Sequence, residues 1–418
     1  MIEATGALGY AKTPVAEVIG RAGVSRKAFY EHFPNKEQCF LEASDVITGS
    51  AIELIEMRYR AAAETGSGTE AAIAALLEQA TANPEAVRLV LVELGALGAD
   101  GILRRERLLA LAERLLHEFL ALEPTTAMPN PILRAIIGGV NQTVYATATG
   151  LRSMSSRRIL ADLVDWISTY QATAEAIGML SPQVPRQALP ASPGGGRAPG
   201  TLSPVVANGR RRRGAGSHGF VVHSQRERIL DAIAGLSATV GYSAITVNRI
   251  GQQASVAPGT FYAHFANKED AFLVAYEVGH SRGLSLVESS CLAAPDWPSG
   301  VRAGINALFG FLASEPIFAH LALVDAPVVS LRLAERARQG FDAYEHIFNH
   351  ALESAGTSVA PLALEAIMGG LLELCLSYTL QQRVGELVSL VGPATYFALA
   401  PILGVEEAAR VAAATHDG

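Results

Sequence analysis

Residues 255–269 read SVAPGTFYAHFANKE, and residues 23–37, which lie 232 positions earlier, read GVSRKAFYEHFPNKE. Around these strings, residues 9–41 and 241–273 align without a gap, and 14 of the 33 positions are identical. The similarity continues downstream, where Glu93 corresponds to Asp325 at the same offset and residues 136–139 match residues 367–370 at an offset of 231. Self-similarity over such a length indicates a duplication. The chain therefore contains two copies of a unit of about 180 residues.

Length and composition agree with a two-unit protein. A chain of 418 residues is expected to form two or more domains, and 50% hydrophobic with 17% charged residues is typical of a packed protein. The scarcity of aromatic residues and the abundance of alanine favour helix over strand. Between the copies, residues 181–223 are rich in Pro, Gly and Ser and are expected to form a flexible linker. The run Arg210–Arg213 within it is either a solvated patch, an address signal or a DNA-contacting arm.

The repeated stretch in the second copy has the pattern of a helix-turn-helix. Residues 225–240 carry apolar side chains at helical spacing, and Thr246 is placed to cap the next short helix. A break at Ser255 and Val256 leads into a helix over residues 257–264, with Pro258 in its first turn. Two short helices joined by a tight turn behind a supporting helix form the unit whose second helix enters the major groove of DNA.

The first copy repeats this pattern. Pro14 opens the second helix, Gly23 turns the chain, and Ser25 is placed to cap a recognition helix that ends near His32. Its supporting helix would need residues equivalent to 225–232, and the sequence begins too late to supply them. Either the start codon is misassigned or this head is shortened, and the second case puts its affinity for DNA in doubt.

The strings at residues 21–37 and 255–269 resemble the signature of the TetR family of bacterial transcriptional regulators. The resemblance implies an all-α chain of two tandem units, each with a three-helix DNA-binding head and about six further helices that bind a small molecule and dimerise. We therefore expect heads at residues 1–43 and 224–273 and bodies at residues 44–180 and 274–410, with residues 181–223 as the linker.

The same resemblance assigns roles in the heads. Phe29 and Phe261 are expected to point into the core, whereas the tyrosines, histidines and lysines of the motif are expected to donate to phosphates, which position a protein on DNA without reading sequence. Each histidine could instead be a satisfied, half-buried residue. The predicted DNA-binding set is Ser25, Arg26, Lys27, Ala28, Tyr30, His32, Lys36, Thr246, Pro258, Gly259, Thr260, Tyr262, His264 and Lys268.

The two reading faces differ in chemistry. In the first copy Arg26 and Lys27 stand beside Ala28 and Glu31 and can offer donors to guanine edges. The second copy offers Thr260 among Pro258, Gly259 and Ala263, which is one hydroxyl and apolar contacts. The heads are therefore predicted to prefer different half-sites, giving an asymmetric operator.

The bodies read as amphipathic helices, and in the family the last two helices of each unit build the dimer interface. Small residues at 138–139 and 369–370 would let two helices approach closely. The fused copies are expected to form an intramolecular pseudo-dimer, or each copy could pair with its twin in another chain. The predicted body helices cover residues 69–81, 84–97, 103–122, 131–150, 157–180, 301–313, 316–329, 331–355, 360–382 and 386–403.

Aromatic side chains within the bodies are candidates for an effector pocket, although an aromatic residue at helical spacing is more often plain core. The pocket is expected to be apolar and of modest size, and the effector is unknown. The candidates are Phe119, Tyr145, Trp166, Phe318, Phe341, Tyr344 and Tyr378.

Other classes of protein find less support. Residues 387–405 are uncharged over 19 positions, long enough to span a membrane, but Pro393 and Pro401 and the lack of a basic flank favour a buried helix. Three scattered cysteines and no signal peptide are expected of a protein of the reducing cytoplasm. No catalytic motif and no metal or cofactor site is recognised, and His346 and His350, four residues apart, read as a solvated helix face.

The net charge of −7 is unhelpful for DNA binding, but it is unevenly spread. Residues 1–41 carry five basic and four acidic side chains, and residues 205–273 carry eight basic and four acidic. Basic heads on acidic bodies fit a nucleic-acid partner. The sequence therefore predicts a DNA-binding regulator without enzymatic activity, a repressor released by a small apolar ligand. The alternative is a ligand-binding or interaction protein of the same fold with impaired DNA binding.

Overall fold

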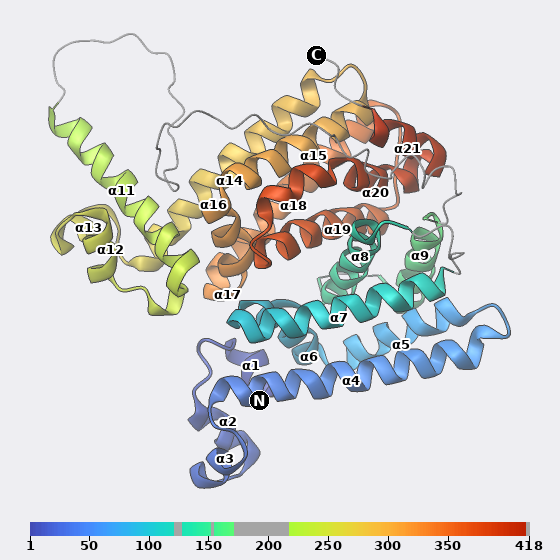
Figure 1. Ribbon diagram of the computed structural model, residues 1–418, viewed down its shortest axis with the longest axis horizontal. Helices are drawn as coiled ribbons and strands as arrows, with labels where there is room; N and C mark the ends of the chain where they lie inside the picture. The colour runs from blue at the N-terminus through green and yellow to red at the C-terminus, as the bar shows by residue number, and fades with distance from the viewer. Residues whose placement is uncertain (121–127, 152–153, 171–216, 415–418) are drawn as a thin grey trace, which may run out of the picture.

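The computed structural model describes residues 1–120, 128–151, 154–170 and 217–414. Within these ranges every regular element is helical, and the elements follow the same order twice (Figure 1). We call α1 to α9 the first unit and α11 to α21 the second unit. The predicted all-α class with two tandem units is confirmed.

Each head consists of a supporting helix and two short helices that meet at a tight turn. Ala4, Val18 and Phe29 form the buried centre of the first head, and Ile233, Ile250 and Phe261 are buried at the centre of the second. The second supporting helix begins at Ser217, inside the predicted linker, and Arg210–Arg213 lie outside the described residues. The helices are α1 (Ile2–Leu8), α2 (Val15–Ala22), α3 (Arg26–His32), α11 (Ser217–Val240), η3 (Tyr242–Ala244), α12 (Val247–Ala254) and α13 (Pro258–His264).

A long helix carries each head into its body. α4 (Lys36–Ala63) and α14 (Lys268–Ala293) begin at Asn35 and Asn267, whose side-chain oxygens accept the backbone N–H three residues on, at 2.8 and 2.9 Å. Neither run contains a proline, and the helices continue through the expected domain boundaries at residues 43–44 and 273–274. Head and body thus share one rigid element in each unit.

Most body helices lie where they were predicted, with ends shifted by a few residues. The predicted helix over residues 386–403 is instead divided into a 3-10 helix, η5, and the α-helix α20. Residues 171–180 lie outside the described part, and the last helix, α21, was not predicted. The first body contains α5 (Gly68–Ala82), α6 (Pro84–Arg88), η1 (Leu89–Glu93), η2 (Leu94–Ala96), α7 (Gly98–Phe119), α8 (Asn130–Ala148) and α9 (Ser156–Ser168). The second contains α15 (Trp297–Ser314), α16 (Pro316–His320), η4 (Leu321–Asp325), α17 (Ala326–Val329), α18 (Leu331–Ser354), α19 (Pro361–Leu380), η5 (Val384–Leu390), α20 (Val391–Leu403) and α21 (Val405–Ala413).

Residues 84–97 and 316–329 were predicted as continuous helices, but each contains a π-helical turn. These turns, η1 and η4, lie at equivalent places and end on Glu93 and Asp325. π turns are rare and are frequently found at functional sites. Hydrophobic periodicity does not reveal them, because four of the five residues in each turn are apolar and no polar face marks the change of phase.

The two units meet along a seam between α8 and α19, with α9 and α20 beside them (Figure 1). A Cβ atom on Gly139 would lie 2.5 Å from the carbonyl oxygen of Ala366, and one on Gly370 would clash with the carbonyl oxygen of Ala135. These contacts are reciprocal, because residues 135 and 139 correspond to residues 366 and 370 at the offset of 231. The two helices of the seam thus approach closely at glycine, as predicted, through contacts that mirror each other.

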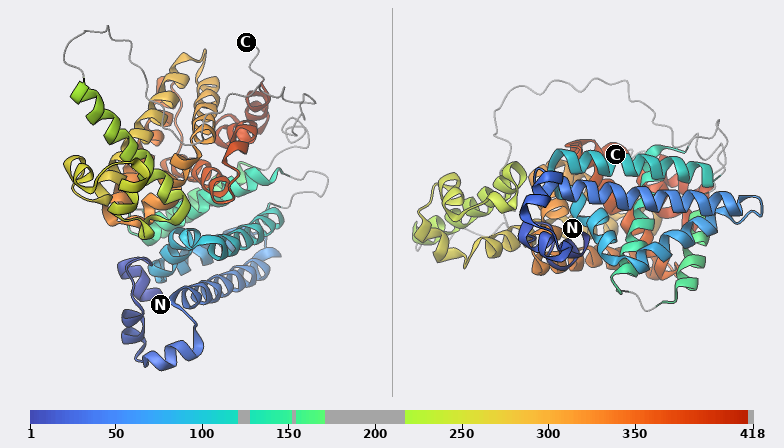
Figure 2. Two further views of the ribbon diagram at one scale, coloured as in Figure 1. Left: turned by 60° about the vertical axis from the view of Figure 1, so that its left-hand side comes forward. Right: turned by 90° about the horizontal axis from the view of Figure 1, so that it is seen from below.

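The outer pair of helices completes the seam. The ring of Tyr170, just after α9, stacks on Phe397 of α20 with centroids 5.5 Å apart, and its hydroxyl donates to the carbonyl oxygen of Phe397 at 2.9 Å. Trp166 packs edge-on against the same ring. Both heads lie at the outside of the molecule, away from the seam (Figure 2).

Two helical stretches of the described chain are long and apolar enough to cross a membrane: α19 and residues 384–403; the bent pair of α15 with α16–α17 would make a third. In the protein, 78% and 56% of the apolar windows of the first two are buried. α20, which contains most of residues 387–405, packs against α8, α15 and α21. This packing agrees with the buried helix preferred from its prolines.

Candidate nucleic-acid interface and cavity

The recognition helices α3 and α13 are anchored by one aromatic face. Phe29 is 4% exposed and Phe261 is fully buried, whereas Tyr30 and Tyr262, the next residues, are 45% and 59% exposed. Because neighbouring residues on a helix point about 100° apart, burying the phenylalanine directs the tyrosine outward. Each helix therefore presents a tyrosine hydroxyl at the surface of its head.

Helix caps hold the two short helices in place. The hydroxyl of Ser25 accepts the N–H of Ala28 at 3.1 Å, and that of Thr246 accepts the N–H of Arg249 at 3.2 Å, as predicted from sequence. Gly23 and Ser255 end α2 and α12 in the left-handed conformation, with φ of 66° and 53°. The predicted turns are thus present in both heads.

The exposed faces of the two recognition helices differ as expected from their residues. Arg26 and Lys27 are exposed on α3, where Lys27 forms a loose ion pair with Glu31 at 3.8 Å. On α13, Pro258 and Gly259 are exposed and Thr260 is partly exposed. No polar side chain on α13 matches the cations of α3.

The motif lysines point inward. Lys36 Nζ donates to the carbonyl oxygen of Tyr10 at 2.8 Å and lies 4.0 Å from the centre of its ring. Lys268 Nζ repeats this at Tyr242, with a second carbonyl at Ile245, 3.1 Å away. Burial lowers the pKa of both ammonium groups, opposed at Lys36 by Glu93. In this geometry the lysines tie the start of α4 and α14 to the loop before the second helix; their contact with phosphate remains a prediction.

Head and body are joined by a buried carboxylate at each π turn. Glu93 is 3% exposed; it accepts the N–H of Tyr10 at 3.3 Å and pairs with Arg88 at 3.4 Å. Burial raises its pKa, and Arg88 lowers it. Asp325 accepts the hydroxyl of Ser237 in α11 at 2.6 Å and contacts His320 Nδ1 at 3.1 Å. Glu93 and Asp325 are each an acidic residue in an otherwise apolar run, and this was the signal in the sequence. The alignment of the two copies paired them, but no role was predicted for them.

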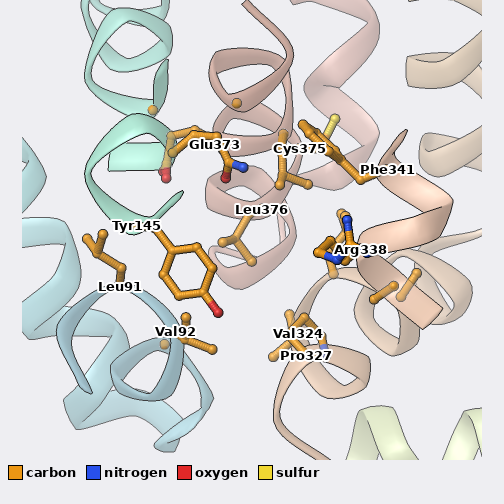
Figure 3. A pocket seen from close by; sticks show the side chains of 18 of the residues that line it. Leu91, Val92, Tyr145, Val324, Pro327, Arg338, Phe341, Glu373, Cys375 and Leu376 are labelled. Carbon is orange, nitrogen blue, oxygen red and sulfur yellow. The ribbon is translucent and has the colours of Figure 1, made fainter. Parts of the chain in front are cut away.

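A cavity of about 530 Å³ lies between the units, beside α19 (Figure 3). Leu91, Val92 and Tyr145 face it from the first unit, and Val324 and Phe341 from the second. Its size falls within the range of small-molecule pockets, and most of its wall is apolar. Because the wall draws on both units, helix patterns within one unit could not locate it.

The predicted pocket residues divide into three groups. Tyr145, Phe318, Phe341 and Tyr344 line this cavity. Trp166 is instead core of the seam, and Tyr378 lines a second cavity of about 320 Å³ near Arg134 and Arg383. Phe119 ends α7, and its side chain lies outside the described residues.

The cations along the large cavity are already paired. Arg338 contacts Glu335 and Asp342 at 2.8 Å, and Arg88 and Arg105 pair with Glu93 and Glu373. Burial lowers the pKa of His280, whose Nε2 contacts the carbonyl oxygen of Gly340 at 3.0 Å, and this favours the uncharged imidazole. Burial likewise raises the pKa of Tyr276 to about 12. Such a wall suits an uncharged ligand.

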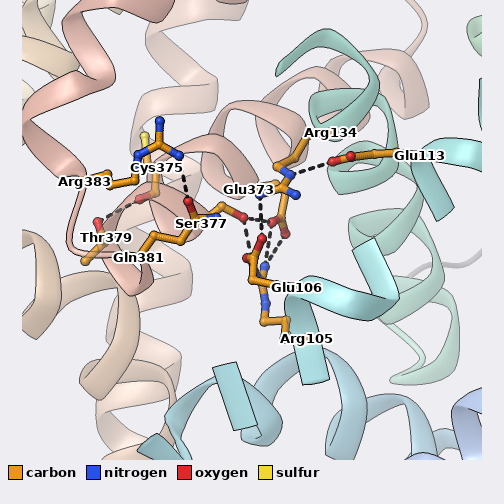
Figure 4. Close-up of polar contacts among 10 residues, drawn as sticks. All are labelled: Arg105, Glu106, Glu113, Arg134, Glu373, Cys375, Ser377, Thr379, Gln381 and Arg383. Atoms are coloured by element: carbon orange, nitrogen blue, oxygen red, sulfur yellow. Dashed lines mark hydrogen bonds and ion pairs between the residues drawn. The ribbon is translucent and has the colours of Figure 1, made fainter. Parts of the chain in front are cut away.

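A polar network crosses the seam next to the cavity (Figure 4). Arg105 of α7 binds both carboxylate oxygens of Glu373 of α19 at 2.6 Å. Arg134 of α8 pairs with Glu106 at 2.9 Å and with Glu113 at 2.7 Å. Sequence reasoning did not identify the cross-unit pair, because its partners lie 268 positions apart.

Comparison with known proteins places the helix-turn-helix motif in a family. The model of bacterial regulatory proteins of the tetR family matches residues 5–43 and 229–275. Solved structures similar to the chain include the fatty acid degradation regulator FadR from Bacillus halodurans, with a TM-score of 0.40 and 23% identity over 42% of this chain and 94% of that one. FadR from Bacillus subtilis in complex with stearoyl-CoA has a TM-score of 0.38 and 22% identity over 42% and 97%. A TetR family regulator from Marinobacter aquaeolei VT8 has a TM-score of 0.33 and 18% identity over 47% and 96%. No curated protein matches the chain.

Proposed function

The chain belongs to the TetR family, as a DNA-binding transcriptional regulator with two tandem units, and from this premise we propose that it is a cytoplasmic repressor released by a small apolar ligand. It acts as a covalent pseudo-dimer, with one head from each unit on a single operator. The carrying observation is the doubled recognition helix, whose aromatic face is buried and whose tyrosine face is exposed in both heads.

DNA contact divides between positioning and reading. Tyr30 and Tyr262, which are exposed beside the buried phenylalanines of α3 and α13, donate to phosphates together with His32 and His264 at the ends of these helices. The caps and first turns of these helices, with Arg26, Lys27 and Thr260, approach base edges. The unequal faces support unlike half-sites, and Ser25, Ala28, Thr246, Pro258 and Gly259 complete the proposed surface.

The packing of α8 against α19 supports the pseudo-dimer. The glycine contacts on the two sides of the seam are reciprocal, which is the geometry of a two-fold dimer interface formed within one chain. A tether between the units gives each an effective concentration for the other in the millimolar range, so intramolecular pairing outcompetes a second chain at cellular concentrations.

The cavity between the units supports ligand control. Its volume of about 530 Å³, apolar wall and paired cations fit one uncharged, apolar molecule per chain. Val324 lines it, and the next residue, Asp325, holds α11 through Ser237. A ligand that displaces the π turn η4 would therefore move the supporting helix of the second head.

A gel-shift assay with the DNA upstream of the protein's own coding region tests DNA binding. We expect affinity to fall by about 10³-fold or more between 50 and 200 mM salt, since phosphate contacts release counterions. Tyr30→Phe and Tyr262→Phe should weaken binding on all sequences, whereas Arg26→Ala should also relax sequence preference. Arg58→Ala, at the far end of α4, removes the same charge away from the head and should leave binding unchanged.

The absence of a shift at every salt concentration would contradict the proposal. It would favour the alternative, a ligand-binding or interaction protein of this fold with impaired DNA binding. The apolar reading face of α13 is the observation that keeps this alternative open.

A further inference from the structure

The polar contacts across the seam break its pseudo-two-fold symmetry. The register of the units is fixed by paired contacts: Arg104 binds Asp45 at 3.0 Å in the first unit, and Arg336 binds Glu277 at 3.2 Å in the second, each pair shifted by 232 positions. At this offset Arg105, the next residue of α7, corresponds to Ala337 of α18.

The equivalent positions on the two seam helices, α8 and α19, follow from their glycine contacts. A Cβ on Gly138 would clash with Glu373, and a Cβ on Gly369 would clash with Gln142, so Gln142 and Glu373 occupy equivalent places. Ala146 corresponds in the same way to Ser377. One side of the seam therefore has an arginine opposite a glutamate, and the other has an alanine opposite a glutamine.

The charged side is buried and hydrogen-bonded across the seam. The side chains of Arg105 and Glu373 are each 8% exposed. Arg105 also donates to the hydroxyl of Ser377 at 3.1 Å, and that hydroxyl donates to Glu373 at 2.6 Å (Figure 4). Ala337 and Gln142, on the other side, both line the large cavity.

We propose that Arg105 and Glu373 make the seam selective for unlike units, so that the first unit pairs with a second unit in preference to its own twin. This rests on the two-unit regulator of the proposed function. Two second units placed together would each set Glu373 against Ala337, leaving two buried carboxylates without a cation. Two first units would each set Arg105 against Gln142, leaving two buried guanidinium groups without that carboxylate.

A buried charge that loses its partner destabilises a complex far more than the intact pair stabilises it, so specificity comes from what the wrong pairing leaves behind. The expected preference for the unlike pairing is at least about 100-fold. A chain in which each unit pairs with its twin in another chain is thereby disfavoured, and the tether supplies the unlike partner from the same chain.

Charge reversal in the full-length chain tests this selectivity. Arg105→Glu sets two carboxylates together, and Glu373→Arg sets two guanidinium groups together. Each single variant should melt at least about 5 °C below the parent chain. Mixed in equal amounts and annealed, the two variants should form a complex of twice the 44.0 kDa of one chain, because each first unit then finds an opposite charge on the other chain.

The double variant R105E/E373R distinguishes loss of the charge pair from a general failure to fold, because it restores opposite charges across the seam. It should regain at least half of the lost melting temperature and run as a 44.0 kDa monomer. Arg104→Glu is the matched control: its partner Asp45 lies in its own unit, so adding Glu373→Arg should not rescue it.

The proposal is overturned if the single variants melt like the parent chain, or if neither mixing nor the double variant restores stability. It is also overturned if the parent chain forms a dimer in which each unit pairs with the same unit of the other chain. Mass and melting temperature are measured without DNA, so failure of the DNA-binding function leaves this test intact.

Discussion

At the scale of single residues, the two heads place different residues in the left-handed conformation of the same turn. Gly23 and Ser255 both end the helix before the recognition helix in the left-handed conformation. Glycine adopts this backbone freely, whereas a side chain crowds the following carbonyl oxygen. The second head therefore stores strain that the first head avoids.

Exchanging these two residues tests that strain. Ser255→Gly should raise the free energy of unfolding by about 0.5–1 kcal/mol, and Gly23→Ser should lower it by about 1 kcal/mol. A Cβ at Gly23 meets nothing within 4 Å, so the effect is conformational and not a clash. Chemical denaturation measures both; effects of the opposite sign would contradict the strain.

Residue identity was enough to predict much of the heads. Ser25 and Thr246 cap helices where proposed, and Phe29 and Phe261 are buried. The inward direction of Lys36 could not be predicted, because it depends on the carbonyl of Tyr10, which reaches it only through the packing of the loop against α4.

At the scale of elements, the helices were largely predictable because their apolar positions repeat with a 3.6-residue period. The π turns η1 and η4 and the continuation of α4 through the expected boundary were not. Both depend on tertiary packing: a buried carboxylate holds each π turn to the head, and the body covers the far end of α4.

The close approach of α19 to α8 and α20 at Gly370 gives the next prediction. Gly370→Ala should destabilise the protein by about 1–3 kcal/mol, because the added methyl group would push α19 off Ala135 and Phe397. Gly310→Ala in α15 is the control, since its Cβ meets nothing within 4 Å. That change should stabilise the helix by about 0.5–1 kcal/mol. Equal effects of the two substitutions in thermal unfolding would argue against the close seam.

At the scale of the whole molecule, the sequence revealed the duplication but not what the two units build together. Tyr145 and Phe341 were candidates within separate units, and only the packing of α8 on α19 sets them around one cavity. The ion pair between Arg105 and Glu373 could not be predicted for the same reason, because it joins two units whose sequence patterns are read separately.

The central claim is that one chain places two unlike heads on one operator. Selection of binding sites from random DNA, followed by the mass of the protein–DNA complex, tests it most directly. The expected result is an asymmetric best site, with guanine contacts under Arg26 and Lys27 in one half only, bound by a single chain of 44.0 kDa. A perfect palindrome as the best site, occupied by two chains, would contradict the claim.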